Sequence, residues 1–270
     1  MGMLYIVATP IGNADEITFR AVETLKAADV ILCEDTRHSR PLLSRYGVEK
    51  PLISYQKFNE RSRCGEILDR LFKGENVAVI SDAGMPTVSD PGHVLIDEVI
   101  EKGLDYTVVS GPCAAINALV LSGLSTEKFL FIGFLPEKKA DRDRVMDKYR
   151  DVDATLIFYL PLSDADEIIK YLYGALGDRK CSLAREMTKK FEQVVRGTLG
   201  DLPEFTHKGE FVLVVEGEKE QNKELNSLSV AEHIDFYLKG GVDKKEAIKK
   251  VARDRGVAKS EIYAETIGKK

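Results

Sequence analysis

Cysteine is scarce in this sequence of 270 residues, and the few cysteines follow no recognisable pattern. No two have the C-x-x-C spacing, and all stand far apart: Cys33, Cys64, Cys113 and Cys181. A disulfide framework and a structural zinc site are therefore not expected, and buried free thiols in a reducing cytoplasm are the default. The four histidines also lack metal-ligand spacing, so we expect no metal ion.

Long hydrophobic runs are missing as well. Residues 3–9 are too few for a signal-peptide core, and no basic segment precedes them. The longest uncharged run, Tyr106–Thr126, is interrupted by Gly111-Pro112 and carries several polar side chains. A buried strand, a turn and a buried helix fit this run better than a membrane span. We therefore expect a cytoplasmic protein with no membrane partner.

An excess of positive charge is also absent. The chain has 39 Lys and Arg against 44 Asp and Glu, a net charge of −5, which on its face argues against a nucleic-acid partner. The charge is uneven, however, because residues 239–270 contain ten Lys or Arg and five Asp or Glu. That segment carries +5 and leaves −10 for residues 1–238. The sign of the total is therefore misleading, because a basic tail on an acidic body is compatible with a nucleic-acid partner.

The apolar content of 44% indicates a globular protein, and the pattern of its first 125 residues indicates the α/β class. Short apolar runs alternate with segments of helical period, as in a largely parallel sheet. The expected strands are Met3–Thr9, Val30–Glu34, Val77–Ser81 and Tyr106–Ser110, and the expected helices are Ile17–Ala28, Glu60–Phe72 and Val94–Lys102.

A second series of elements predicts another α/β domain with a mixed sheet. Helices are expected from about Lys138 to Arg150 and after the capping-box pattern Ser163-x-x-Asp166. The expected strands are Leu130–Gly133, Ala154–Tyr159, Cys181–Arg185, Glu192–Gly197 and Glu210–Glu216. Few helical patterns separate the last three strands, so antiparallel pairing is expected there. We place the two domains at residues 1–120 and 121–217.

The C-terminal part reads as a polar linker followed by a small helical domain. Residues 218–228 have few apolar side chains, and residues 229–270 contain the capping-box patterns Ser229-x-x-Glu232 and Asp243-x-x-Glu246. One apolar face ends at Gly256, and a further helix begins near Lys259. A helix-turn-helix and an ordinary helical hairpin fit this pattern equally well.

Three loops rich in glycine and proline follow predicted strands: Thr9–Asn13, Ser81–Pro86 and Ser110–Ala114. Ligands bind at this edge of open α/β sheets. Each loop by itself could be a connecting turn, but three on one edge favour a nucleoside-containing cofactor. The G-x-G-x-x-G and phosphate-loop fingerprints are absent, which disfavours NAD and ATP. S-adenosylmethionine, which has no run of phosphates, fits better.

Four segments carry a resemblance to a known family. Val7–Asn13, Cys33–Arg37, Ser81–Gly92 and Ala184–Lys189 resemble the tetrapyrrole-methylase-fold (class III) methyltransferases. Within them, the chain is most similar to the branch that methylates a ribose 2′-hydroxyl of small-subunit ribosomal RNA. The first loop, Ala8–Asn13, differs from the G-x-G-P-G-D type of the small-molecule members, which favours the RNA branch.

The resemblance implies a homodimeric enzyme with two α/β domains and a small C-terminal helical domain. It implies S-adenosylmethionine as cofactor and a cytidine ribose of 16S rRNA, near the decoding region of the small ribosomal subunit, as methyl acceptor. The implied cofactor contacts are Pro10, Ile11, Gly12, Asp82, Ala83, Gly84, Met85, Cys113, Ala114, Tyr159 and Leu160. By periodicity, Tyr159 is a core aromatic residue.

A ribose hydroxyl is a weak nucleophile, so a general base would help the reaction. The candidates are Glu34, Asp35 and Glu60, although Glu60 also fits the acidic first turn of a helix. Basic residues near these loops and in the tail are candidates for RNA contacts: Arg37, Arg40, Arg61, Arg185, Lys244, Lys245, Lys249 and Lys250. For Arg185, an ion pair with Glu186 at the domain junction is the alternative.

Two other functions remain open from the sequence. The first is a methylase of the same fold acting on a tetrapyrrole or a modified amino acid, for which a basic helical tail has little use. The second is a non-enzymatic regulator that senses a ligand with its α/β body and binds nucleic acid with its tail. Transfer of a labelled methyl group to unmodified small-subunit RNA separates the enzyme from the regulator.

Overall fold

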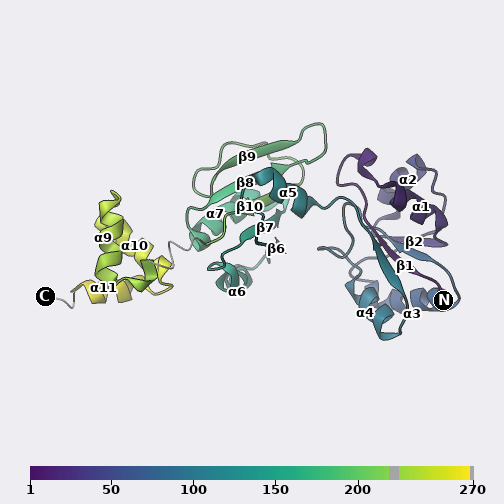
Figure 1. The fold of residues 1–270 in the computed structure, drawn as a ribbon, viewed down its shortest axis with the longest axis horizontal. Coiled ribbons are helices and arrows are strands. Elements are labelled where there is room, and N and C mark those ends of the chain that lie inside the picture. The colour runs from purple at the N-terminus through teal and green to yellow at the C-terminus, as the bar shows by residue number, and fades with distance from the viewer. Residues whose placement is uncertain (219–224, 268–270) are drawn as a thin grey trace. The chain divides into compact units, whose positions relative to one another are not determined.

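A computed structural model of the chain describes residues 1–218 and 225–267, and it confirms the parallel sheet expected in the first half (Figure 1). The strand order is β3-β2-β4-β1-β5, and every neighbouring pair is parallel. The strands are β1 (Leu4–Val7), β2 (Val30–Cys33), β3 (Leu52–Ser54), β4 (Val77–Val79) and β5 (Tyr106–Val109). Side chains on both faces of the central strands are buried, which explains their continuous apolar runs.

Two pairs of helices cover the two faces of this sheet (Figure 1). After the short turn η1 (Ala14–Glu16), helix α1 (Phe19–Ala27) packs with α2 (Thr36–Arg45) on one face. Helices α3 (Glu60–Phe72) and α4 (His93–Glu101) pack on the other. Because α1 follows β1 and α4 follows the adjacent β4, the chain leaves these neighbouring strands toward opposite faces. This divergence opens a crevice at the carboxyl ends of the two strands.

Helix α2 and strand β3 are not expected from the sequence. Helix α2 contains Pro41, is polar overall and buries only Ser39 and Leu43 among its ten residues, so it offers few apolar side chains as a helix signal. Strand β3 has three half-buried residues at the edge of the sheet. Both elements depend on contacts with β2: α2 packs on one face of the sheet, and β3 pairs with the edge of β2. Such contacts between distant residues leave no local pattern in the sequence.

The second sheet is mixed, as predicted. Its order is β6-β7-β10-β8-β9, with β6 parallel to β7 and every other pair antiparallel. Its strands are β6 (Phe129–Phe134), β7 (Thr155–Leu160), β8 (Lys180–Arg185), β9 (Gln193–Thr198) and β10 (Phe211–Val215). Helices α6 (Lys139–Tyr149) and α7 (Ala165–Leu176) contribute to one apolar cluster of this sheet, and α5 (Ala114–Ser122) contributes to another.

The capping box expected at Ser163 and Asp166 is wrong. Ser163 lies inside the short turn η2 (Leu162–Asp164), and α7 begins after Asp164 without a side-chain cap. The carboxylate of Asp166 instead faces the ring of His207, with 2.9 Å between Oδ2 and Nε2. The pattern failed because a turn of another type precedes the helix.

The C-terminal helices belong to a second compact unit, which also includes residues 147–154. Helices α9 (Val230–Lys239), α10 (Lys244–Asp254) and α11 (Lys259–Ile267) surround one apolar cluster. The capping box of Ser229 and Glu232 is confirmed, and Asp243 Oδ1 accepts hydrogen bonds from the N–H groups of Lys245 and Glu246. Most of the expected linker, residues 219–224, lies outside the described residues.

The cysteines are free thiols, as predicted. Cys33, Cys64 and Cys181 are buried, and Cys113 is half-buried. Among the helices in residues 1–218 and 225–267, none has the length and apolarity needed to cross a bilayer.

Candidate active site

The loops after β1 and β4 are locked together at the crevice. The N–H of Thr9 donates to the carbonyl of Gly84 over 2.8 Å, and the N–H of Gly84 donates to the carbonyl of Thr9 over 3.2 Å. Gly84 has a φ of +79°, and a Cβ there would lie 3.2 Å from the side chain of Ile11. Glycine thus permits both the left-handed backbone and the close approach of the two loops.

A first cavity of about 340 Å³ lies against these loops. Its size falls in the ordinary range for a small-molecule site. Tyr159 from β7 forms part of the wall, and its ring makes edge contacts with Phe131 and Phe134 at centroid distances of 4.9 and 5.4 Å. Eight of the predicted cofactor contacts line this cavity: Ile11, Ala83, Gly84, Met85, Cys113, Ala114, Tyr159 and Leu160.

A second cavity of about 290 Å³ shares part of its wall with the first. The remaining predicted cofactor contacts, Pro10, Gly12 and Asp82, line it together with His38 and Lys189. The two cavities have three lining residues in common: Ile11, Ala83 and Glu210. The structure therefore divides the predicted contacts between two adjoining spaces.

Three carboxylates interact at the first cavity and beside it. Burial, followed by the charges of Glu34 and Asp82, raises the pKa of Asp90 to about 7, although a hydrogen bond from Ser81 lowers it. The pKa of Glu34 is also raised, first by burial and then by Asp82, whose N–H lies 3.5 Å from Glu34 Oε1. Perturbed carboxyl groups in a cavity are typical of functional sites. A cationic ligand would relieve this repulsion.

Asp90 lines the first cavity but was not among the site residues expected from the sequence. It lies in the quoted motif Ser81–Gly92, but this motif does not indicate that its carboxyl group interacts with Glu34, which is 56 positions earlier. The available signal was a further acidic residue within a motif already assigned to the ligand edge.

Strained backbone marks both sides of the first cavity. In the described part of the chain, four residues other than glycine have left-handed φ angles: Thr87, Ser89, Glu186 and Thr188. Ser89 lines the cavity, and so does Met187, which lies between the last two. Such residues cost on the order of 1–3 kcal/mol each and cluster at functional sites. The site geometry is thus maintained against local strain.

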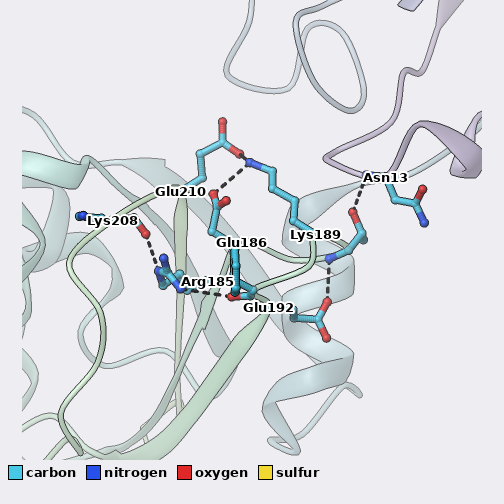
Figure 2. Close-up of polar contacts among 9 residues, drawn as sticks. Asn13, Arg185, Glu186, Lys189, Glu192, Lys208 and Glu210 are labelled. Carbon is cyan, nitrogen blue, oxygen red and sulfur yellow. Dashed lines mark hydrogen bonds and ion pairs between the residues drawn. The ribbon is translucent and has the colours of Figure 1, made fainter. Parts of the chain in front are cut away.

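The loop after β8 is held by a polar network (Figure 2). Lys189 Nζ lies 2.9 Å from Glu186 Oε1 and 3.2 Å from Glu210 Oε2. Although burial lowers the pKa of Lys189, the hydrogen bond to Glu186 and the charge of Glu210 raise it overall, so the ammonium stays charged. Thr188 Oγ1 accepts the N–H of Asn13 over 2.9 Å and ties this loop to the β1 loop (Figure 2).

The candidate bases have different surroundings. Hydrogen bonds from Arg37 lower the pKa of Asp35 to about 2, and its carboxylate also caps α2. Glu60 is buried, and its Oε1 accepts the N–H groups of Gly92 over 2.8 Å and Val94 over 3.2 Å. These contacts favour structural roles for Asp35 and Glu60. Glu34 lies beside Asp82 in the carboxylate group.

The predicted RNA contacts also differ in their surroundings. The guanidinium of Arg185 donates to the carbonyls of Lys208 and Phe191, which favours a structural role (Figure 2). Four others are exposed on the surface: Arg40, Arg61, Lys244 and Lys245. The remaining three have neighbours, since Arg37 pairs with Asp35, Lys249 pairs with Glu246, and Lys250 lies over the ring of Tyr237.

The carboxylates are not arranged as metal ligands. Within residues 1–218 and 225–267, no three His, Cys, Asp or Glu side chains are grouped as a metal ion requires.

Comparisons with known proteins agree with the fold. The family model of tetrapyrrole (corrin/porphyrin) methylases matches residues 3–203. Among solved structures, the methyltransferase CobJ has a TM-score of 0.63 at 18% identity over 80% of this chain and 95% of its own. The uroporphyrin-III-C-methyltransferase from Thermus thermophilus has a TM-score of 0.58 at 20% identity, over 80% and 94% of the two chains.

Curated relatives cover almost the whole chain. The ribosomal RNA small subunit methyltransferase I of Halalkalibacterium halodurans is 44% identical over 97% of this chain and 93% of its own. The protein of the same name from Bacillus subtilis is 39% identical over the same shares of the two chains. The similarity therefore includes the C-terminal helices.

Proposed function

Since the chain belongs to the tetrapyrrole (corrin/porphyrin) methylase family, and within it to the group named ribosomal RNA small subunit methyltransferase I, we propose that it is an rRNA 2′-O-methyltransferase. Its methyl donor is S-adenosylmethionine, and its acceptor is the ribose of a cytidine in 16S rRNA near the decoding centre. The observation that carries the proposal is the first cavity, lined by the perturbed Asp90, which shares wall residues with a second cavity.

The first cavity suits S-adenosylmethionine in its walls and its charge. The cofactor carries a sulfonium and an ammonium group, and Asp90, which lines this cavity, can balance positive charge. Gly84 lines this cavity, and its left-handed backbone lets the β4 loop lie close to Ile11. Ala83 and Met85 from the β4 loop and Tyr159 and Leu160 from β7 supply the rest of the proposed contact surface.

The second cavity is the proposed entrance for the acceptor ribose. When bound, S-adenosylmethionine supplies an electrophilic methyl carbon, and the attacking oxygen must be aligned with it. Glu34 is the proposed base for the 2′-hydroxyl, because its raised pKa makes it a better proton acceptor than an ordinary carboxylate. Lys189, held charged by Glu186 and Glu210, is proposed to contact an oxygen of the substrate.

The C-terminal helices are the proposed RNA-binding domain. Helix α10 carries Lys244, Lys245, Lys249 and Lys250, whereas α11 has two glutamates and a single lysine. The positive charge thus lies on the first helix of the α10–α11 pair. This distribution supports a role in which α10 contacts RNA phosphates, rather than one in which α11 recognises base edges.

We also propose a homodimer. Helix α5 exposes the apolar side chains of Ile116 and Val120, at 42% and 69%, and β6 begins with the exposed Phe129. Exposed apolar groups of this kind favour association. Light scattering is expected to give twice the chain mass of 30.1 kDa, and Val120→Glu should lower that mass.

The proposed reaction is tested with labelled S-adenosylmethionine and unmodified small-subunit RNA, both free and in assembled subunits. We expect label on one ribose 2′-oxygen of a cytidine. RNA with 2′-deoxycytidine at the mapped position is the control and should accept no label. Label on a base, or no transfer to either substrate beside an active reference enzyme, would contradict the proposal.

Cofactor affinity is expected to rise with pH between about 6 and 8. The pKa of Asp90 is about 7 in the free protein, and a bound cation favours its carboxylate. Binding below pH 7 must therefore release a proton, which weakens affinity by up to about tenfold per pH unit. Calorimetry at pH 6, 7 and 8 measures this slope. If the affinity of the unmodified protein for the cofactor did not change with pH, a charge interaction between the cofactor and Asp90 would be excluded.

A further inference from the structure

The loop between β3 and α3 presents an aromatic side chain to solvent. Phe58 is 86% exposed, and the side chain of Lys57 before it is exposed as well. Arg61, in the first turn of α3, is a further exposed cation. Neither cation forms an ion pair with a residue in the described ranges. Aromatic rings beside positive charges are the surface that binds single-stranded nucleic acid.

Hydrogen bonds hold this loop in one conformation. The N–H of Gln56 donates to Asn59 Oδ1 over 2.7 Å, and Asn59 Nδ2 donates back to the carbonyl of Ser54 over 3.3 Å. The N–H of Asn59 also donates to the carbonyl of Gln56 over 2.9 Å. The exposure of Phe58 is therefore a property of a closed turn, and little conformational entropy is lost when a ligand binds the ring.

The same loop is bonded to the candidate active site. Gln56 Nε2 donates to the backbone carbonyl of Glu34 over 2.7 Å, and Ser54 Oγ donates to that carbonyl over 3.3 Å. The carboxylate of Glu34 faces the N–H of Asp82, which lines the second cavity. Because β2 and β3 are neighbouring parallel strands, their loops also share one edge of the sheet. Phe58 is thus fixed relative to the proposed base.

We propose that Phe58 is a stacking platform for an unpaired RNA base next to the methylated nucleotide, with Lys57 and Arg61 contacting the adjoining phosphates. This inference rests on the proposed function. Stacking on an aromatic ring tolerates any base. The platform therefore positions the RNA strand while other contacts select the sequence.

The test compares the full-length variants Phe58→Ala, Phe58→Leu and Phe58→Trp with the unmodified protein. Affinity is measured for a transcript of unmodified small-subunit rRNA. Alanine and leucine should each weaken binding about tenfold or more, and tryptophan should restore it. The matched control is Phe72→Ala, since Phe72 is a half-exposed phenylalanine at the opposite end of α3. Its affinity for RNA and every variant's affinity for S-adenosylmethionine should be unchanged.

Several results would overturn the platform. Unchanged RNA affinity of Phe58→Ala would do so, and full affinity of Phe58→Leu would show an apolar contact in place of stacking. A change of molar mass in light scattering would assign Phe58 to a subunit contact. Methyl transfer by the unmodified protein is measured separately. If transfer occurs, the results above contradict only the role of Phe58. If the unmodified protein neither transfers methyl groups nor binds RNA, the proposed function is contradicted as well.

Discussion

Replacing Asp90 by asparagine is expected to weaken S-adenosylmethionine binding about 10- to 100-fold and, at pH 8, to raise the melting temperature. The loss follows from removing a charged partner, because hydrogen bonds to charged groups contribute about 1.5–3 kcal/mol. The gain in melting temperature follows from the raised pKa of Asp90 in the folded protein. The unfolded chain ionises Asp90 near pH 4, whereas the folded chain does so near pH 7, so stability is lost as pH rises between these values.

Opposite changes in affinity and stability separate a ligand contact from a structural residue. Calorimetry measures affinity, and thermal unfolding is followed at pH 4 and pH 8. At pH 4 Asp90 is already neutral in the folded protein, so the melting temperatures of the variant and the unmodified protein should differ less than at pH 8. Asp97→Asn, on the solvent-exposed side of α4, is the control. A fall in melting temperature at pH 8 would assign Asp90 a role in folding.

Removing the four lysines of α10 is expected to weaken RNA binding about 100-fold at moderate salt. The variant replaces Lys244, Lys245, Lys249 and Lys250 with glutamine in the full chain. Each phosphate that is no longer neutralised should reduce the slope of log affinity against log salt by about 0.7–0.9. Removing four such charges therefore predicts a reduction of about 3, measured by titrating the transcript at several salt concentrations.

The control for the lysine variant removes positive charge elsewhere. Lys26, Lys73 and Lys102 lie at the C-terminal ends of α1, α3 and α4, away from the ligand edge of the sheet. Their replacement by glutamine should change the slope little. Equal effects of the two variants would mean that net charge, and not helix α10, governs RNA binding. Cofactor affinity should stay constant in both.

The strands that build the site could be predicted from the sequence because their signals are local. Runs such as Val77–Val79 are apolar on both faces, and the β1 and β4 loops carry the small residues that a ligand edge needs. The mixed character of the second sheet followed from strand patterns without intervening helices. Helix α2 lacked such a signal, since it contains Pro41 and has few apolar side chains to bury.

The interactions within the site could not be predicted in the same way. The pKa of Asp90 depends on carboxylates from the loops of β2 and β4, which meet because β4 lies between β2 and β1. Lys189 was quoted within a motif, but its raised pKa depends on Glu186 and on Glu210, which comes from the loop before β10. Strand order, not residue spacing, brings these groups together.

The shared wall of the two cavities also has a thermodynamic consequence. Ile11, Ala83 and Glu210 contact both spaces, so a ligand in one alters the surroundings of a ligand in the other. A polyanion next to a cation gives this coupling a favourable sign, and coupling between binding sites is reciprocal. With the proposed cofactor in the first cavity and the proposed RNA in the second, we therefore expect RNA to tighten cofactor binding by the same factor as the cofactor tightens RNA binding.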